Sequence, residues 1–415
     1  MRKSQTIKNI LTVFIMIILC GCSIQAAEAD TINGKTEQGY AISTIPVYGP
    51  KANSDGNPFP SVEILDLWDY GLVSAYCGDQ LYRLNPASLE LEKMMVLKNG
   101  TGKMPNWYCG KIIPRYTPEY DYLLLWDQHT KKMYHAATDG TYVKSFEEQK
   151  LGWLRNTGID MDIGSNVVHG TIIYAEYYLE GFNVDTDTVK VWRSTDQGRT
   201  WTAVFSQNCR QSESSEIYHF LFVRRDPYNE GHWYLGSGDT PDESNIWRSV
   251  DDGLTWTKIN DPLFSGELQS VHRTCNLYFT EDYIYWGTDD SVTAYGTGHG
   301  GKWCRSPRNI ETNQLSVEVL AELGDWVRIT QETPYGVFLA TEKRFEDKAY
   351  VWMAPYEDLE HPRLVARTDY GFGSQISNAS YGSRLFFASP WKLYPATYSD
   401  TRIHVIDIST MSVVE

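Results

Sequence analysis

The sequence lacks the excess of basic residues with which nucleic-acid-binding proteins neutralise phosphates. Its 415 residues include 37 Lys and Arg against 53 Asp and Glu, which gives a formal net charge of -16 at pH 7. A field this negative repels a phosphate backbone, so we expect no nucleic-acid partner. Helical periodicity is also scarce, because apolar residues recur in short alternating runs that Gly, Asp, Asn and Pro interrupt. Together with 13% aromatic residues, this pattern predicts an all-β chain.

Metal-binding signatures are missing as well. The seven cysteines include no C-x-x-C pair and no zinc-like spacing, and two histidines in phase without a third do not complete a zinc or manganese site. Acidic loops such as 160–162 and 185–187 do not exclude a bound calcium ion, but neither forms a complete calcium-loop pattern. We therefore assign no metal and no cofactor.

Long apolar runs are absent except at the N-terminus. There, residues 10–19 follow three basic residues and are too short to span a bilayer comfortably, which is typical of an export signal. The run Leu-Cys-Gly-Cys that ends at Cys22 looks like a bacterial lipobox, with Cys22 as the lipidated residue. We predict an exported lipoprotein of the cell membrane or outer membrane, attached only through this anchor, with a plain secreted protein as the alternative. The predicted segments are a signal peptide at 1–21, a flexible tether at 22–39 and one domain at 40–415.

Two copies of one motif, S-x-D-x-G-x-T-W, lie 55 residues apart, and each is followed by an alternating run. This arrangement is typical of a hairpin in which Asp accepts hydrogen bonds from turn amides, Gly takes a positive φ and Trp packs on the sheet. We therefore interpret both copies as structural. Their residues are Ser194, Asp196, Gly198, Thr200 and Trp201 in the first copy and Ser249, Asp251, Gly253, Thr255 and Trp256 in the second.

The two motifs resemble the Asp-box, or BNR, repeats of sialidase-like β-propellers. The resemblance implies a propeller fold and a carbohydrate as substrate or ligand. Sialidases of this type carry an early Phe/Tyr-Arg-Ile-Pro motif that supplies the first of three arginines. Here the components at 112–115 stand in the wrong order, so the resemblance does not extend to true sialidase activity.

A second repeat supports the same fold. In six units, the most apolar strand has three mostly apolar residues and then a small one, as in the runs that end at Gly236 and Gly287, and 122–126 is a seventh copy without the small residue. A small residue near the axis lets adjacent sheets converge. We predict a seven-bladed β-propeller of four-stranded antiparallel blades, with six blades as the alternative and with 40–48 as an extra outer strand that closes the ring. The blades are placed at 61–97, 108–147, 157–205, 216–260, 270–321, 326–368 and 373–415.

In propellers of this type, the innermost strand starts and the second strand ends on one face, opposite the Asp-box turns. We expect the site on that face. Cys77 and Cys109 fall there in adjacent blades and are the first candidates for a disulfide. The catalytic candidates are His219, His272, Asp289 and Glu176, and the substrate-binding candidates are Lys111, Arg273, Arg328 and Gln375.

Three classes of function fit these residues. A glycoside hydrolase acting on a complex or anionic glycan needs two carboxyl groups flanking the bond, and we prefer this class. A lyase acting on uronate-containing glycans would use His219 or His272 as base, with Arg273 and Arg328 as clamp. The third class is a noncatalytic surface lipoprotein that binds a glycan or a protein. In each case we expect Arg273→Ala and His272→Ala to abolish function with little change in melting temperature.

Overall fold

The computed structural model describes part of the chain. The backbone is described for residues 32–35, 41–46, 63–67, 73–77, 80–85, 87–96, 107–113, 122–127, 130–137, 143–144, 150–152, 154–162, 170–178, 187–209, 217–290, 300–308, 311, 313–341, 349–368, 378–381, 384–388 and 402–407. Side chains are described for 84–85, 87–90, 124–127, 130–135, 150–152, 157–162, 170–178, 187–209, 217–290, 300–308, 311, 313–341, 350–365 and 405–407. Within the described ranges, no helix is both long enough and apolar enough to cross a membrane.

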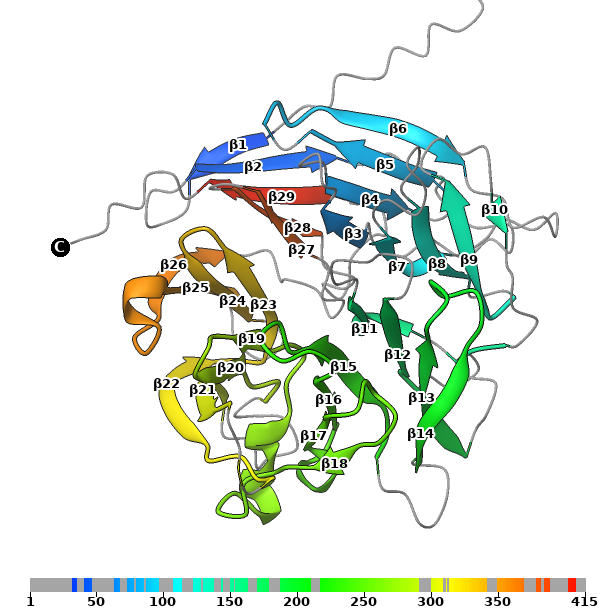
Figure 1. Ribbon diagram of the computed structural model, residues 1–415. Coiled ribbons are helices and arrows are strands. Elements are labelled where there is room, and N and C mark those ends of the chain that lie inside the picture. Colours follow the sequence, from blue (N-terminus) through cyan, green and yellow to red (C-terminus); the bar gives the residue numbers. More distant parts are fainter. Residues whose placement is uncertain are drawn as a thin grey trace, which may run out of the picture.

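The described strands form seven antiparallel sheets, which Figure 1 shows arranged in a ring. The first sheet contains β3 (Glu63–Leu67), β4 (Val73–Cys77), β5 (Gln80–Leu84) and β6 (Leu91–Val96). The second contains β7 (Trp107–Ile113), β8 (Tyr122–Asp127), β9 (Lys132–Ala137) and β10 (Val143–Lys144). The third contains β11 (Leu154–Asp162), β12 (Thr171–Glu176), β13 (Thr188–Ser194) and β14 (Thr202–Asn208).

The fourth sheet contains β15 (Phe220–Arg225), β16 (Trp233–Ser237), β17 (Asn245–Ser249) and β18 (Thr257–Lys258). The fifth contains β19 (Tyr278–Phe279), β20 (Tyr283–Gly287), β21 (Gly301–Pro307) and β22 (Glu318–Gly324). The sixth contains β23 (Val327–Thr333), β24 (Gly336–Thr341), β25 (Ala349–Pro355) and β26 (Arg363–Thr368). Three short 3-10 helices lie in the described connections, namely η2 (Pro241–Glu243), η3 (Gly266–His272) and η5 (Tyr356–Asp358).

The seventh sheet joins the two ends of the described chain. It contains β27 (Asn378–Tyr381), β28 (Arg384–Ala388) and β29 (Arg402–Asp407), followed by β2 (Ala41–Pro46) and β1 (Ile32–Lys35) from the N-terminal side. β2 pairs antiparallel with β29, with Ile42 opposite Ile406, which is the ring-closing role predicted for 40–48. β1 lies inside the segment predicted to be a flexible tether, so that prediction is wrong for these four residues, whose backbone pairs with β2.

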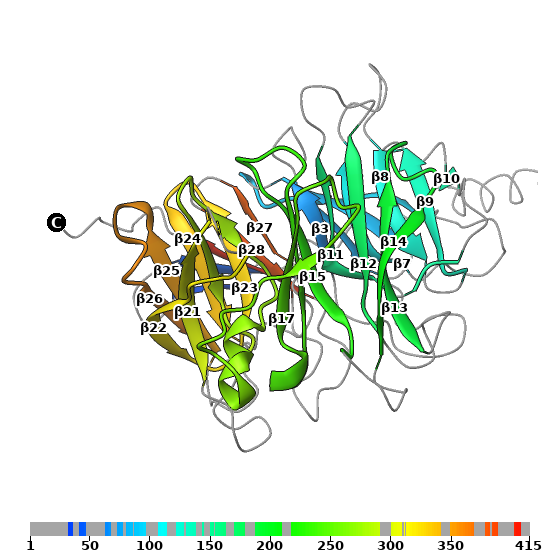
Figure 2. The ribbon, with the colours of Figure 1, turned by 60° about the horizontal axis from the view of Figure 1, so that its bottom comes forward.

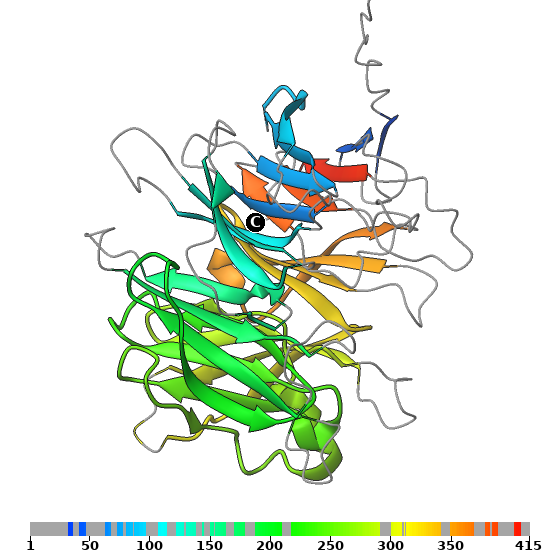
Figure 3. The same ribbon diagram turned by 90° about the vertical axis from the view of Figure 1, so that its right-hand side faces the viewer.

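The core lies between the sheets rather than at one centre. Ile173 and Val191 of the third sheet pack with Phe220 and Trp233 of the fourth, and similar clusters join the fourth sheet to the fifth and the fifth to the sixth. Figures 2 and 3 show the sheets from other sides, packed face against face. The innermost strand β3 also contacts both β7 and β27, so contacts run from the last sheet back to the first. The predicted all-β propeller is therefore confirmed.

Both S-x-D-x-G-x-T-W motifs form the predicted turns between the third and fourth strands of a sheet. In the first copy, Thr200 Oγ1 donates to Asp196 Oδ2 at 2.6 Å, Trp201 Nε1 donates to the Gly198 carbonyl at 3.0 Å, and Gly198 has a φ of +79°. The second copy repeats these contacts. The turns also dock on the preceding sheet, because Arg193 of the third sheet pairs with Asp252 of the second motif. The two motifs are thus structural elements remote from the opposite face.

Candidate functional site

The face opposite the motif turns carries a group of ionisable side chains from the fourth, fifth and sixth sheets. Asp239 follows β16, Asp289 and Asp290 follow β20, and Arg328 is the second residue of β23. Arg273 lies beside them because its carbonyl accepts a hydrogen bond from the Asp289 amide at 2.7 Å. We call this group, made of His219, Asp239, Arg273, Asp289, Asp290 and Arg328, the mouth cluster.

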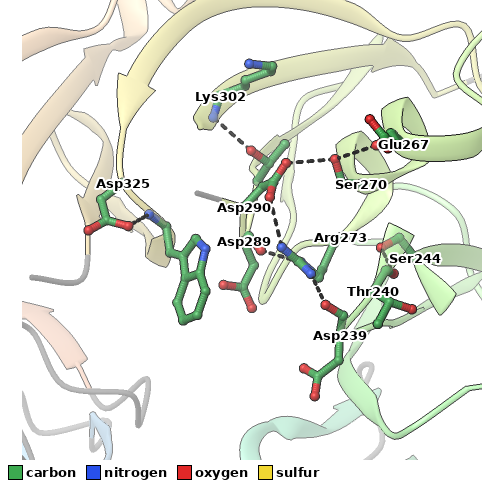
Figure 4. A network of polar contacts seen from close by, with 12 residues as sticks. Asp239, Thr240, Ser244, Glu267, Ser270, Arg273, Asp289, Asp290, Lys302 and Asp325 are labelled. Atoms are coloured by element: carbon green, nitrogen blue, oxygen red, sulfur yellow. Dashed lines mark hydrogen bonds and ion pairs between the residues drawn. The ribbon is translucent and has the colours of Figure 1, made fainter. Parts of the chain in front are cut away.

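Arg273 holds the mouth cluster together (Figure 4). Its guanidinium donates to the backbone carbonyls of Asp239 and Asp289, and its Nη2 lies 3.0 Å from Asp290 Oδ1. The second oxygen of Asp290 accepts a 2.7 Å hydrogen bond from Ser270. Both charged side chains are buried, at 4% and 6% exposure, so this is an ion pair shielded from water.

The second arginine of the mouth cluster is paired as well. Arg328 Nη1 lies 2.6 Å from Asp289 Oδ2, and its guanidinium stacks 4.5 Å from the ring centroid of Trp326. The Cys275 thiol donates to the same Asp289 oxygen at 3.3 Å. Charge-assisted contacts of this kind fix both side chains in one geometry.

Asp239 is the most exposed carboxylate of the mouth cluster, with a third of its side chain in contact with solvent. Its Oδ1 lies 3.3 Å from Nε2 of the buried His219, whose ring stacks on Tyr177 with centroids 3.7 Å apart. Partial burial raises the pKa of Asp239, but the neighbouring His219, Arg273 and Arg328 outweigh it and lower the pKa to about 2. Asp239 is therefore an ionised acceptor that a ligand can reach.

Glu176, predicted to be catalytic, occupies a structural position. It is buried, and its two oxygens accept hydrogen bonds from the amides of Gly152 and Lys190 and from Trp192 Nε1, at 2.8–2.9 Å. Burial is the largest influence on this carboxyl and raises its pKa, as a general acid would need. Three internal donors nevertheless occupy its oxygens, so the geometry contradicts a catalytic role for Glu176.

His272 is also displaced from its predicted place at the start of an inner strand. It is the last residue of η3 and is fully buried. Its Nε2 accepts a 3.0 Å hydrogen bond from the Asp261 amide, and Nδ1 lies 3.1 Å from the Gln269 carbonyl. Both ring nitrogens are thereby committed to the connection between the fourth and fifth sheets, which contradicts a role as catalytic base.

The burial of His272 predicts a pH dependence of stability. Burial is the largest influence on its pKa and lowers it to about 4, against about 6.5 in an unfolded chain. Between these values the unfolded chain takes up a proton that the folded protein excludes. The free energy of unfolding should therefore fall as the pH is lowered from about 6.5 to 4, by up to about 1.4 kcal/mol per pH unit.

Urea unfolding at several pH values measures this dependence. His272→Gln keeps an acceptor for the Asp261 amide but cannot take up the proton, so its stability should fall less steeply over the same range. His135, whose pKa burial also lowers, contributes the same slope to both proteins. Equal slopes in the variant and the wild type would contradict the assignment to His272.

The remaining predicted residues fall outside the mouth cluster or outside the described residues. Lys111 pairs with Leu124 in the middle of β7, four residues beyond Trp107, where the strand begins, so it is not at a strand start as predicted. Its side chain, Gln375, Cys22 and the proposed bond between Cys77 and Cys109 lie outside the described part. Among described residues, no group of three His, Cys, Asp or Glu could hold a metal ion.

The acidic residues at 160–162, which had left a calcium site open, form hydrogen bonds and an ion pair within the fold. Asp160 accepts a 2.9 Å hydrogen bond from the Arg225 amide, and Asp162 forms a 2.6 Å ion pair with the Arg225 guanidinium. These acids therefore connect the third sheet to the fourth.

The sequence missed how tightly the charges of the mouth cluster are paired. The consecutive acids Asp289 and Asp290 after an apolar strand were a signal for this, because each acid takes a different arginine. The stacking of Tyr177 on His219 was not predicted either, because β12 and β15 belong to different sheets.

Comparison with known proteins supports the fold. No protein-family model matches the sequence, and no curated protein matches it significantly. The extracellular domain of BT4673 from B. thetaiotaomicron, named as a one-component system, is similar in structure, with a TM-score of 0.51 and 11% identity over 86% of this chain and 39% of that chain. YCF48, solved with a D1 peptide, gives a TM-score of 0.50 and 13% identity over 86% of this chain and 99% of that chain. This chain therefore spans less than half the length of the BT4673 domain, and the likenesses show a β-propeller fold.

Proposed function

We propose that this protein is an exported, lipid-anchored β-propeller that binds a hydroxyl-rich glycan at the mouth cluster. The observation that carries the proposal is the ionised Asp239, which stays a third exposed beside buried, charge-paired arginines. Carboxylates and guanidinium groups fixed by one another offer oriented acceptors and donors to sugar hydroxyls.

A binding role accounts for the cluster better than catalysis does. Glu176 and His272 are engaged within the fold, and Arg273 and Arg328 each have an aspartate partner. An anionic glycan would have to compete with those aspartates, which disfavours the charged substrates considered for a sialidase-like enzyme or a lyase. The extracellular neighbour and the peptide-bound neighbour are compatible with a ligand-binding propeller, and Cys22 remains the proposed site of lipidation.

A glycoside hydrolase is the second candidate. It is favoured by the position of Asp239 and Asp289 on neighbouring sheets, since hydrolysis needs two carboxyl groups on either side of the bond. Asp239 would then serve as the ionised partner, because its pKa is about 2.

Glycan binding followed by mass spectrometry of the bound sugars tests these proposals. We expect wild-type protein to retain neutral or amino-containing glycans intact, and Asp239→Asn to weaken binding at least about tenfold, since a charge-assisted hydrogen bond is worth about 1.5–3 kcal/mol. Stability should fall by about 1 kcal/mol or less, because Asp239 is partly in water.

The matched control is Asp282→Asn, an exposed aspartate in the turn between β19 and β20 on the opposite face, which should bind like wild type. Products heavier by one water would support the hydrolase instead, and unsaturated products would indicate a lyase. A panel in which no glycan binds would refute the proposal.

A further inference from the structure

One buried oxygen of the mouth cluster is left unsatisfied by the described residues. Asp289 Oδ2 accepts from Arg328 and Cys275, whereas Oδ1 has no hydrogen-bond partner among them. The side chain is only 6% exposed. Leaving a buried acceptor unpaired costs about 1–3 kcal/mol, and more for a charged group. A ligand that brings a hydrogen-bond donor to this oxygen would recover that free energy.

The charge of the mouth cluster indicates which kind of donor it would accept best. Three carboxylates, those of Asp239, Asp289 and Asp290, face two guanidinium groups. Carboxylates therefore outnumber arginines at this place, and the His219 imidazole beside Asp239 is a further cation only when it is protonated. A ligand with a positive charge would balance the excess, whereas a carboxylate or sulfate would increase it.

The backbones of the two residues concerned are tied to the same arginine. Arg273 donates to the backbone carbonyls of both Asp239 and Asp289, which fixes the two residues next to each other. Figure 4 shows their side chains extending to the same side of the Arg273 guanidinium. Asp239 contributes the exposed oxygen of this pair and Asp289 the unsatisfied one.

We infer that the mouth cluster recognises a protonated amine on its ligand, held between Asp239 and Asp289, so that the glycan class is one with free amino groups. This inference rests on the proposed glycan-binding function and narrows it. An ammonium group has three donors and no acceptor, so it can serve both carboxylates at once. An N-acetyl group on the same nitrogen would remove the charge and two of the donors.

Isothermal titration calorimetry with three tetrasaccharides of equal length tests the inference on the purified protein. The probes are the tetrasaccharides of glucosamine, N-acetylglucosamine and glucose, at a pH where the amine is protonated. We expect the glucosamine form to bind about tenfold or more tightly than the other two, because a charge-assisted contact is worth about 1.4 kcal/mol or more. Equal affinities for glucosamine and glucose would overturn the amine inference while leaving glycan binding intact.

Substitutions of the two aspartates then test where the amine of the ligand binds. Asp289→Asn and Asp239→Asn should each reduce the preference for glucosamine over glucose, and Asp282→Asn should retain it. Since Asp289→Asn also weakens the Arg328 pair, Asp239→Asn serves as the variant that keeps the fold. A preference unchanged in Asp239→Asn would overturn the placement. Failure of glucosamine to bind refutes the inference alone if another glycan of the wider panel binds, and refutes the proposed function too if none does.

Discussion

Arg273→Ala is expected to lower the free energy of unfolding by about 3–5 kcal/mol, the cost of removing one partner from a buried ion pair. The variant would leave Asp290 buried without its cation and would free the carbonyls of Asp239 and Asp289. This expectation replaces the sequence-based one, in which Arg273→Ala changed function but not melting temperature. Chemical denaturation of the purified variant measures the loss.

Arg305→Ala is the matched control. Arg305 pairs with two carboxylates, where Arg273 pairs with one, but its partners Glu318 and Glu360 are about half exposed. Exposed pairs contribute about 0–1 kcal/mol each, so this variant should lose far less stability. If both variants lost the same amount, burial would not explain the role of Arg273.

Gly287→Ala is the second change with a large expected effect. A Cβ at this position would lie 2.2 Å from Val327 Cγ1 of the next sheet, closer than real side chains approach. The sheets would have to separate at the inner strands, and overpacking of this kind costs about 1–3 kcal/mol. Thermal and urea unfolding should both show a lower stability.

A double-mutant cycle with Val327→Ala gives the specific test. The second substitution removes the two methyl groups nearest the added Cβ, so the double variant should lose less stability than the sum of the single variants. Additive losses would mean that the two sheets do not meet at this point.

Much of the fold could be predicted because its signals are local. The turns at 194–201 and 249–256 depend on hydrogen bonds within eight residues, and the small residue Gly287 at the end of β20 lies where the fifth and sixth sheets meet. The ring-closing strand at 41–46 was also predicted, as a run left over outside the seven units. The additional strand β1 could not be predicted, because it lies in a segment whose composition is that of a flexible tether, although its backbone pairs with β2.

The site was predicted less completely. The face was predicted from strand order, and the structure brings His219, Asp289, Arg273 and Arg328 together there with Asp239 and Asp290. Two residues differ from the expectation in different ways: internal donors occupy the carboxylate of Glu176, and the backbone of Lys111 lies inside β7 rather than at its start. The partners of a side chain and the depth of its burial depend on contacts between sheets, which a repeat pattern does not specify.

Two neighbouring residues, His272 and Arg273, show what the sequence determines and what the tertiary structure decides. The sequence alone determined the repeated strands, the turn motifs and the concentration of ionisable residues at strand ends, because these depend on neighbours along the chain. Only the tertiary structure decided that His272 is buried against the Asp261 amide while Arg273, the next residue, enters the mouth cluster. The reason is physical: burial and charge pairing depend on which sheets meet, and the partners of Arg273 lie 34 and 16–17 residues away in the chain.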